Sequence, residues 1–128
     1  MSYYISKIIN GNFDSIEDLV VKALKTEEFG VLSEIDIQEK LKEKLDVDFR
    51  KYKILGACNP PNAYRALQHE DKIGVLLPCN VVLQELADNQ IEVVTVDPVA
   101  SMMAVENKQM AGIANDIKEK LKRVIASL

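Results

Sequence analysis

The sequence predicts a single α+β domain over residues 1–128, built on an antiparallel sheet. Two strand-like segments flank the short polar turn Asp88-Asn89-Gln90, as in a hairpin. The segment from about Asn107 to Ala126 repeats apolar residues at the helical period, as expected of a long helix that covers one face of a sheet. A chain of 128 residues with 48% hydrophobic content is one domain of ordinary size with enough apolar residues for a core.

The first strand is predicted over Tyr3–Ile9 from its β-branched and aromatic content. Asn10-Gly11-Asn12 is typical of a turn, and a helix is expected to start near Asp14 or Ser15, either of which can cap it. Gly30 is a natural stop for this helix.

A second strand is predicted over Val31–Ile35, followed by a short helix that Asp36 caps, with Glu39 completing a capping box. The helical period predicts that this helix turns its apolar residues toward the core. They are Ile37, Leu41 and Leu45.

The third strand is predicted over Tyr52–Cys58. Asn59 is a favourable N-cap and Pro60 suits the first helical position, so a helix should run from Pro60 to about Gln68.

The apolar stretch Ile73–Leu77 ends at Pro78, and strand character resumes over Val81–Leu86. The returning strand is Ile91–Val96, after which Asp97 can cap a short helix. The final helix then presents one continuous apolar stripe: Met110, Ile113, Ala114, Ile117, Leu121, Val124, Ile125 and Leu128.

The charge of the chain argues against nucleic-acid binding, because a net charge of -4 and a pI near 5.0 provide no basic face. No window approaches the roughly 20 apolar residues of a membrane span, and the first residues lack a signal-peptide pattern. The expected location is the cytoplasm, where the two cysteines would be mainly reduced.

Two Cys-Asn dipeptides contain the only cysteines of the chain: Cys58-Asn59 and Cys79-Asn80. If the third and fourth strands are antiparallel neighbours, the two dipeptides lie close together. Cys58 would also lie just before a helix N-terminus, where the helix dipole stabilises a thiolate. These four residues are the candidate ligand-binding site, and Cys58 and Cys79 are the candidate metal ligands.

Several landmarks in this region resemble a known prokaryotic family. They are Ile54-Leu55-Gly56-Ala57-Cys58-Asn59-Pro60, Ala63, Ala66-Leu67, Ile73-Gly74, Leu77-Pro78-Cys79-Asn80-Val81-Val82 and Asp97-Pro98. The chain resembles the domain of unknown function 302, in its cysteine-bearing kind. The resemblance implies a TATA-binding-protein-like fold with a β-α-β-β-β-β-α core, here with two inserted helices, and a homodimer. It implies no activity.

Three functions remain open. The first is a binding module for a small ligand or a soft metal ion such as zinc or copper. The second is a thiol-dependent redox enzyme or sensor, and the third is a structural or partner-binding protein with inert buried thiols. One chain has only two cysteines, so a four-ligand zinc site would need a second subunit. The strands near Val82 and Val94 are apolar on both faces, which suggests that helices cover one face and a second subunit the other. His69 is expected to be a surface residue without a role.

Overall fold

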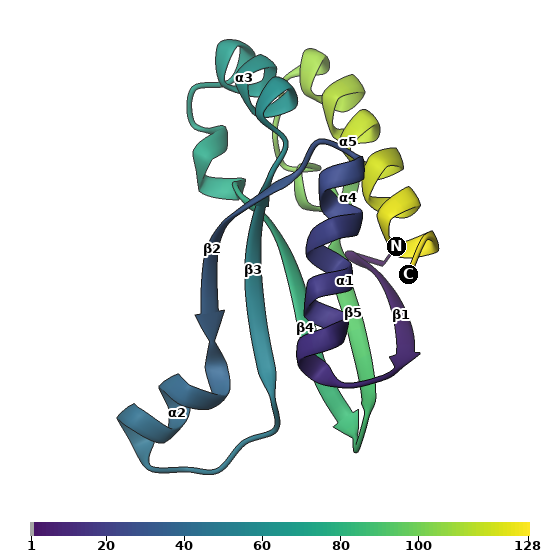
Figure 1. The fold of residues 1–128 in the computed structure, drawn as a ribbon. Helices are drawn as coiled ribbons and strands as arrows, with labels where there is room; N and C mark the ends of the chain where they lie inside the picture. The colour runs from purple at the N-terminus through teal and green to yellow at the C-terminus, as the bar shows by residue number, and fades with distance from the viewer. Residues whose placement is uncertain (1) are drawn as a thin grey trace.

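A computed structural model describes residues 2–128 as five strands and a set of helices (Figure 1). In chain order the elements are β1 (Tyr4–Asn10), α1 (Phe13–Thr26), β2 (Gly30–Asp36), α2 (Ile37–Leu45), β3 (Tyr52–Cys58), α3 (Pro60–His69), the 3-10 helix η1 (Ile73–Leu76), β4 (Cys79–Ala87), β5 (Gln90–Val96), α4 (Pro98–Ser101) and α5 (Lys108–Ala126). The predicted α+β class is confirmed, and α2 and α3 are the two inserted helices.

The sheet is antiparallel throughout, with the strand order β1-β5-β4-β3-β2. The edge strands are β1 and β2, and β4 of the hairpin β4–β5 is the central strand. The predicted turn between β4 and β5 is confirmed, and Asn89 adopts the left-handed conformation that such a turn requires (φ 58). The N-terminal strand β1 therefore pairs with β5, far from it in sequence.

Helices α1 and α5 cover one face of the sheet (Figure 1). The α5 stripe is buried as predicted from Met110 to Ile125, and only Leu128 at its end is partly exposed. It packs on the sheet side chains that point toward the helices: Leu55, Val81, Leu83, Ile91 and Val93. Alternation along the strands turns the remaining side chains to the opposite face, which we call the open face.

The open face is apolar in its middle. The strand register places Ile35, Ile54, Val82 and Val94 side by side on four neighbouring strands. Ile35 is 45% exposed and the other three are partly exposed. Tyr4, at the start of β1, is also exposed on this face.

Two helix boundaries differ from the prediction. The N-cap of α1 is Asn12, whose side-chain oxygen accepts hydrogen bonds from the amides of Asp14 and Ser15. At the other end Glu28 takes the left-handed conformation (φ 68), and Gly30 already belongs to β2. The cap is therefore a residue of the polar turn, two or three positions earlier than expected.

Two further predictions were wrong. The apolar stretch Ile73–Leu77 is not a strand, because its first four residues form η1. The stripe of α2 does not face the core: no residue of this helix is buried, and Leu45 is 66% exposed. Helix α2 lies past the end of β2, away from α1 and α5 (Figure 1). Among residues 2–128, no helix has the length and hydropathy to cross a membrane.

Candidate functional site

The two Cys-Asn dipeptides come together where β3 ends and β4 begins. These strands pair antiparallel, as predicted, with Ala57 opposite Cys79. Cys58 follows Ala57, so the Cα atoms of Cys58 and Cys79 lie within about 9 Å of each other. The sequence therefore identified a true spatial cluster.

The side chains of this cluster nevertheless divide between the two faces of the sheet. Cys79 shares the helix side with its partner Ala57 and is only 6% exposed. Asn80 is the next residue of β4, and it is exposed on the open face. The same alternation turns Cys58, which is partly exposed, away from the side of Ala57 and Cys79.

Asn59 holds the backbone in place. Its side-chain oxygen accepts a hydrogen bond from the amide of Asn62 (3.2 Å) and so caps α3, as predicted. Its side-chain nitrogen donates to the carbonyl of Glu27 (3.0 Å), which ties α3 to the end of α1. Both polar ends of this buried amide are thus used within the fold.

Cys79 is a poor nucleophile in this environment. Burial, followed by the nearby Cys58, raises the pKa of the Cys79 thiol to about 11. At neutral pH the fraction of thiolate is therefore smaller than in an ordinary cysteine, and disulfide exchange proceeds through the thiolate. Both cysteines are free, and a disulfide would require their opposed Cβ directions to turn toward each other.

Metal binding would also require additional ligands. Among residues 2–128, no three His, Cys, Asp or Glu side chains are grouped so that they could hold a metal ion. His69 is exposed at the end of α3, and its carbonyl accepts a hydrogen bond from the side chain of Asn107. Cys58 and Cys79 remain the candidate ligands, and a four-ligand site would need further groups.

Beside Asn80, the open face carries a groove of about 370 Å³. Its floor is apolar and comes from β4 and β5, and its walls come from the N-terminus, η1 and α4. The lining residues are Tyr3, Tyr4, Val75, Leu76, Leu77, Pro78, Asn80, Val82, Val94, Thr95, Val96 and Ser101. This set contains no charged side chain, and Asn80 supplies an exposed amide.

The wall at Pro78 is fixed by close packing on β3. A side chain at Gly56 would bring its Cβ to 2.8 Å from Cγ of Pro78 and 2.3 Å from Oγ of Ser33. Only glycine leaves room for these neighbours, so the lack of a side chain at Gly56 allows the proline to pack against the sheet. Tyr3, Tyr4 and Ser101 of the groove were not predicted, because nothing in the sequence places β1 and α4 beside the open face of β5. The apolar content of both faces of β4 and β5 was the available signal.

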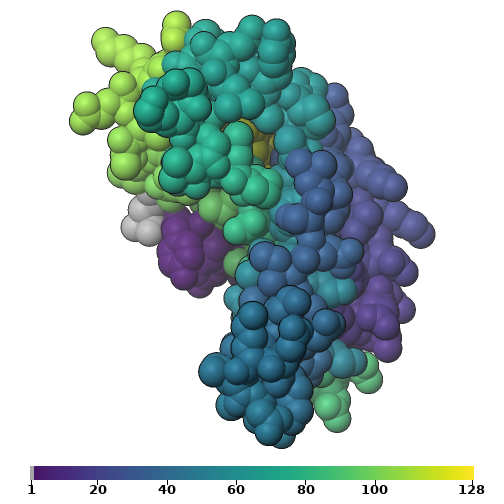
Figure 2. All heavy atoms as spheres, turned by 90° about the vertical axis from the view of Figure 1, so that its left-hand side faces the viewer, coloured from purple at the N-terminus to yellow at the C-terminus, as the bar shows by residue number. Residues whose placement is uncertain are grey.

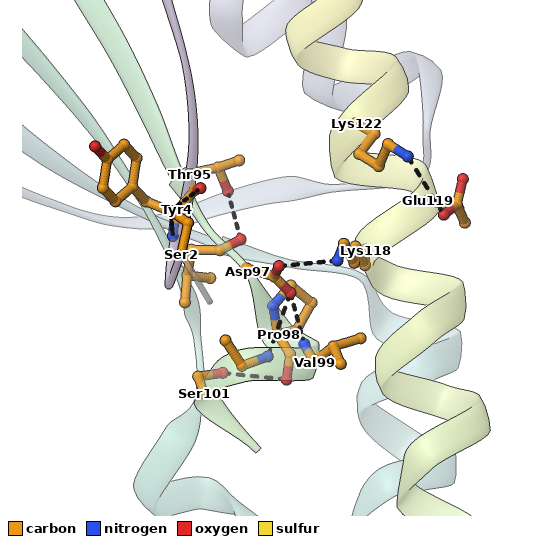
Figure 3. Close-up of polar contacts among 12 residues, drawn as sticks. Ser2, Tyr4, Thr95, Asp97, Pro98, Val99, Ser101, Lys118, Glu119 and Lys122 are labelled. Atoms are coloured by element: carbon orange, nitrogen blue, oxygen red, sulfur yellow. Dashed lines mark hydrogen bonds and ion pairs between the residues drawn. The ribbon is translucent and has the colours of Figure 1, made fainter. Parts of the chain in front are cut away.

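Asp97 lies at the corner between β5 and α4, whose residues Val96 and Ser101 line one end of the groove (Figure 3). Its carboxylate accepts hydrogen bonds from the amides of Val99 (2.9 Å) and Ala100 (3.3 Å), so the predicted cap is confirmed. Its other oxygen lies 2.9 Å from Nζ of Lys118 on α5. Burial opposes ionisation of Asp97, but Lys118 and the two amides outweigh it and lower the pKa of the carboxyl.

Comparisons with known proteins agree with this architecture. A crystal structure of an uncharacterized conserved protein DUF302 from Bacillus stearothermophilus is 26% identical in sequence, with a TM-score of 0.90 over 98% of each chain. The search of curated proteins gave no match. The family model described as "Domain of unknown function DUF302" matches residues 5–128. The chain therefore belongs to the DUF302 family, whose function is not known.

Proposed function

We propose that this protein is a homodimer that binds a small, uncharged and largely apolar molecule in the groove of the open face. The observation that carries the proposal is the lining of that groove. It combines an apolar floor at Val82 and Val94 with one exposed amide at Asn80. Ligand sites are usually concave and apolar, with a few polar groups that fix orientation.

Among residues 2–128, the side chains that line the groove carry no charge, and this favours a neutral ligand. A charged molecule would lose hydration there without gaining a partner of opposite charge, which is costly. Asn80 can both donate and accept a hydrogen bond, so a neutral ligand with an amide, hydroxyl or N–H group is favoured.

The thiol chemistry has less support. The side chains of Cys58 and Cys79 lie on opposite faces by strand alternation, and Cys79 is kept protonated by its pKa of about 11. Zinc or copper binding and a redox cycle would both require a rearrangement of this strand end. Packing is the role that the burial of Cys79 favours.

A second subunit is part of the proposal. A ligand-binding site usually buries 70–90% of the surface of its ligand. The groove of one chain is open along the sheet. The row Ile35, Ile54, Val82 and Val94 continues from the groove across the open face and is uncovered in one chain. A partner protomer on this face would cover the row and roof the groove.

We also infer that the protein works in the cytoplasm and does not bind nucleic acid. The net charge of -4 supports the second inference, because phosphate binding requires a basic surface. The buried thiol of Cys79 supports the first, since a reducing compartment keeps cysteines free.

A titration with indole, a neutral aromatic with one N–H donor, tests the ligand site. Saturable chemical-shift changes in NMR spectra are expected at Asn80, Val82 and Val94. Asn80→Ala should weaken binding by about fivefold, because it removes one hydrogen bond. Asn115→Ala, on the exposed side of α5, is the matched control and should bind normally. Changes confined to other parts of the protein would contradict the site.

Sedimentation equilibrium tests the homodimer. The wild-type protein should be dimeric at micromolar concentration, and Val94→Lys should dissociate it by placing a charge in the middle of the open face. Leu19→Lys, at a site 42% exposed on α1, should leave the dimer intact. A monomeric wild-type protein would rule out the dimer while leaving the indole experiment valid.

A further inference from the structure

The segment that joins β2 to β3 is longer than the sheet requires. Asp36 and Lys53 are directly opposed in the antiparallel pair, and a two-residue turn is enough to close such a hairpin. The chain instead inserts α2 and a return segment, which we call the arm (residues 37–50). Figure 2 shows the arm as a separate lobe at the foot of the molecule.

The arm has an apolar side that its own chain covers only in part. Ile37, Leu41 and Leu45 recur every fourth residue along α2, and none of them is buried. Leu45 is 66% exposed and Val47, just after the helix, is 43% exposed. A helix of nine residues is marginal in water without tertiary packing, so a partner surface on this side would stabilise it.

The base of the arm is continuous with the open face. Nε of Arg50 donates to the side-chain oxygen of Gln84 on β4 (2.9 Å), and Gln84 in turn donates to Glu92 on β5 (2.8 Å). The Arg50 guanidinium also lies 4.4 Å from the ring centre of Phe49. Arginine and aromatic residues of this kind often anchor protein interfaces.

We propose that in the homodimer each arm lies on the open face of the other protomer. This inference rests on the proposed homodimer and specifies how its two copies hold each other. The chain carries both surfaces that such a contact needs, the uncovered stripe of α2 and the uncovered row on the sheet. Two copies related by a twofold axis can therefore satisfy both pairs of surfaces at once.

The area of the sheet supports the contribution of the arm. Five strands of about seven residues give an open face of about 550 Å². A stable interface removes about 800 Å² from each partner. The arm is an exposed apolar element next to the sheet, so it would enlarge the contact toward this area.

The charges of the arm favour a protein partner over a polyanion. Its basic and acidic side chains balance, so it carries no net charge to attract nucleic acid or an anionic membrane. The four basic residues are Lys40, Lys42, Lys44 and Arg50, and the four acidic residues are Glu39, Glu43, Asp46 and Asp48.

The test compares two variants with the wild-type protein by sedimentation equilibrium. Leu41→Gln with Leu45→Lys removes the apolar side of the arm, and both sites tolerate polar residues because neither is buried. The dissociation constant of the dimer should rise by about tenfold or more. Leu67→Lys, at a site 47% exposed on α3, is the matched control and should have no effect.

A mixed sample of two differently methyl-labelled copies gives a second, independent measurement. Intermolecular NOEs are expected between the methyl groups of Leu45 in one copy and those of Val82 or Val94 in the other. If Val94→Lys dissociates the dimer while the arm variant leaves the constant unchanged and these NOEs are missing, the arm inference is overturned and the homodimer stands. If the wild-type protein is monomeric, both are overturned.

Discussion

Lys118 on α5 forms an ion pair with Asp97 at the end of β5, with 2.9 Å between Nζ and the carboxylate oxygen (Figure 3). The same carboxylate caps the short helix α4 through the amides of Val99 and Ala100. One buried side chain thus fixes the end of the sheet, the turn that borders the groove, and the helix behind them.

The contribution of this ion pair is predicted to depend on pH. The pKa of Asp97 is lowered in the folded state, so folding stabilises the carboxylate, and this stability is fully present above the ordinary pKa of 3.8. It should be lost as the pH falls below that value toward the folded pKa. Asp97→Asn keeps a capping oxygen but removes the charge, and should cost about 1–2 kcal/mol at pH 7.

Urea unfolding of wild-type protein and Asp97→Asn at pH 7, 5 and 3 measures this effect. The difference in free energy of unfolding should persist at pH 5 and shrink at pH 3. A difference that stays constant over this range would show that the ion pair does not stabilise the fold.

The packing of α5 is predicted to be a major source of stability. Leu121 is fully buried against the sheet, so Leu121→Ala should lower the free energy of unfolding by about 2–5 kcal/mol. Leu19→Ala makes the same truncation at a site 42% exposed on α1 and should cost well under 1 kcal/mol. Equal losses in the two variants would contradict the assignment of the α5 stripe to the core.

Local chemistry explains which elements could be predicted from the sequence. Strand β3 has the predicted bounds because a strand-like run ends at Asn59-Pro60, which can only begin a helix efficiently. The long stripe of α5 was equally clear. The stretch Ile73–Leu77 failed because a short apolar run with a glycine has no period to distinguish a strand from a 3-10 turn.

Tertiary relationships explain what the sequence could not provide. The period of α2 shows that the helix has an apolar side, but periodicity does not reveal what covers that side. Cys79 and Asn80 were predicted as one site because they are adjacent in the chain. In a strand, adjacent side chains point to opposite faces, so Asn80 belongs to the groove and Cys79 to the core. Tyr3 and Tyr4, at the start of β1, reach the groove only through the pairing of β1 with β5.

The two thiols are predicted to differ strongly in reactivity. Cys58 is partly exposed, whereas Cys79 is buried with a pKa raised to about 11. With Ellman's reagent at pH 8, one thiol should react readily in native protein and the second only after unfolding. Cys58→Ser should remove the fast reaction. Persistence of that reaction in Cys58→Ser would assign it to Cys79 and contradict the packing role.

The raised pKa of Cys79 also predicts a loss of stability in alkaline solution. The unfolded thiol ionises near its ordinary pKa of 9.0, but the folded thiol ionises only at about 11. The contribution of the Cys79 thiol to the free energy of unfolding is therefore complete below pH 9 and declines as the pH rises from 9 toward 11. Cys79→Ala should show a smaller decline in unfolding free energy between pH 8.5 and 10.5 than wild-type protein. Parallel curves would show that the thiol does not contribute.

Gly56 is predicted to be intolerant of any side chain, because Ser33 and Pro78 occupy the space that a side chain would need. In Gly56→Ala the new Cβ would lie 2.8 Å from Cγ of Pro78 and 2.3 Å from Oγ of Ser33. Overpacking of this kind typically costs about 1–3 kcal/mol. Adding Ser33→Gly should recover only part of the loss, since the proline ring cannot rotate away as the hydroxyl can.

Gly30→Ala, where a new Cβ meets nothing within 4 Å, is the matched control on β2. Urea unfolding compares the variants, and indole titration reports whether the groove has changed shape. If Gly56→Ala were as stable as Gly30→Ala and bound indole normally, the close packing of Pro78 on β3 would not shape the groove.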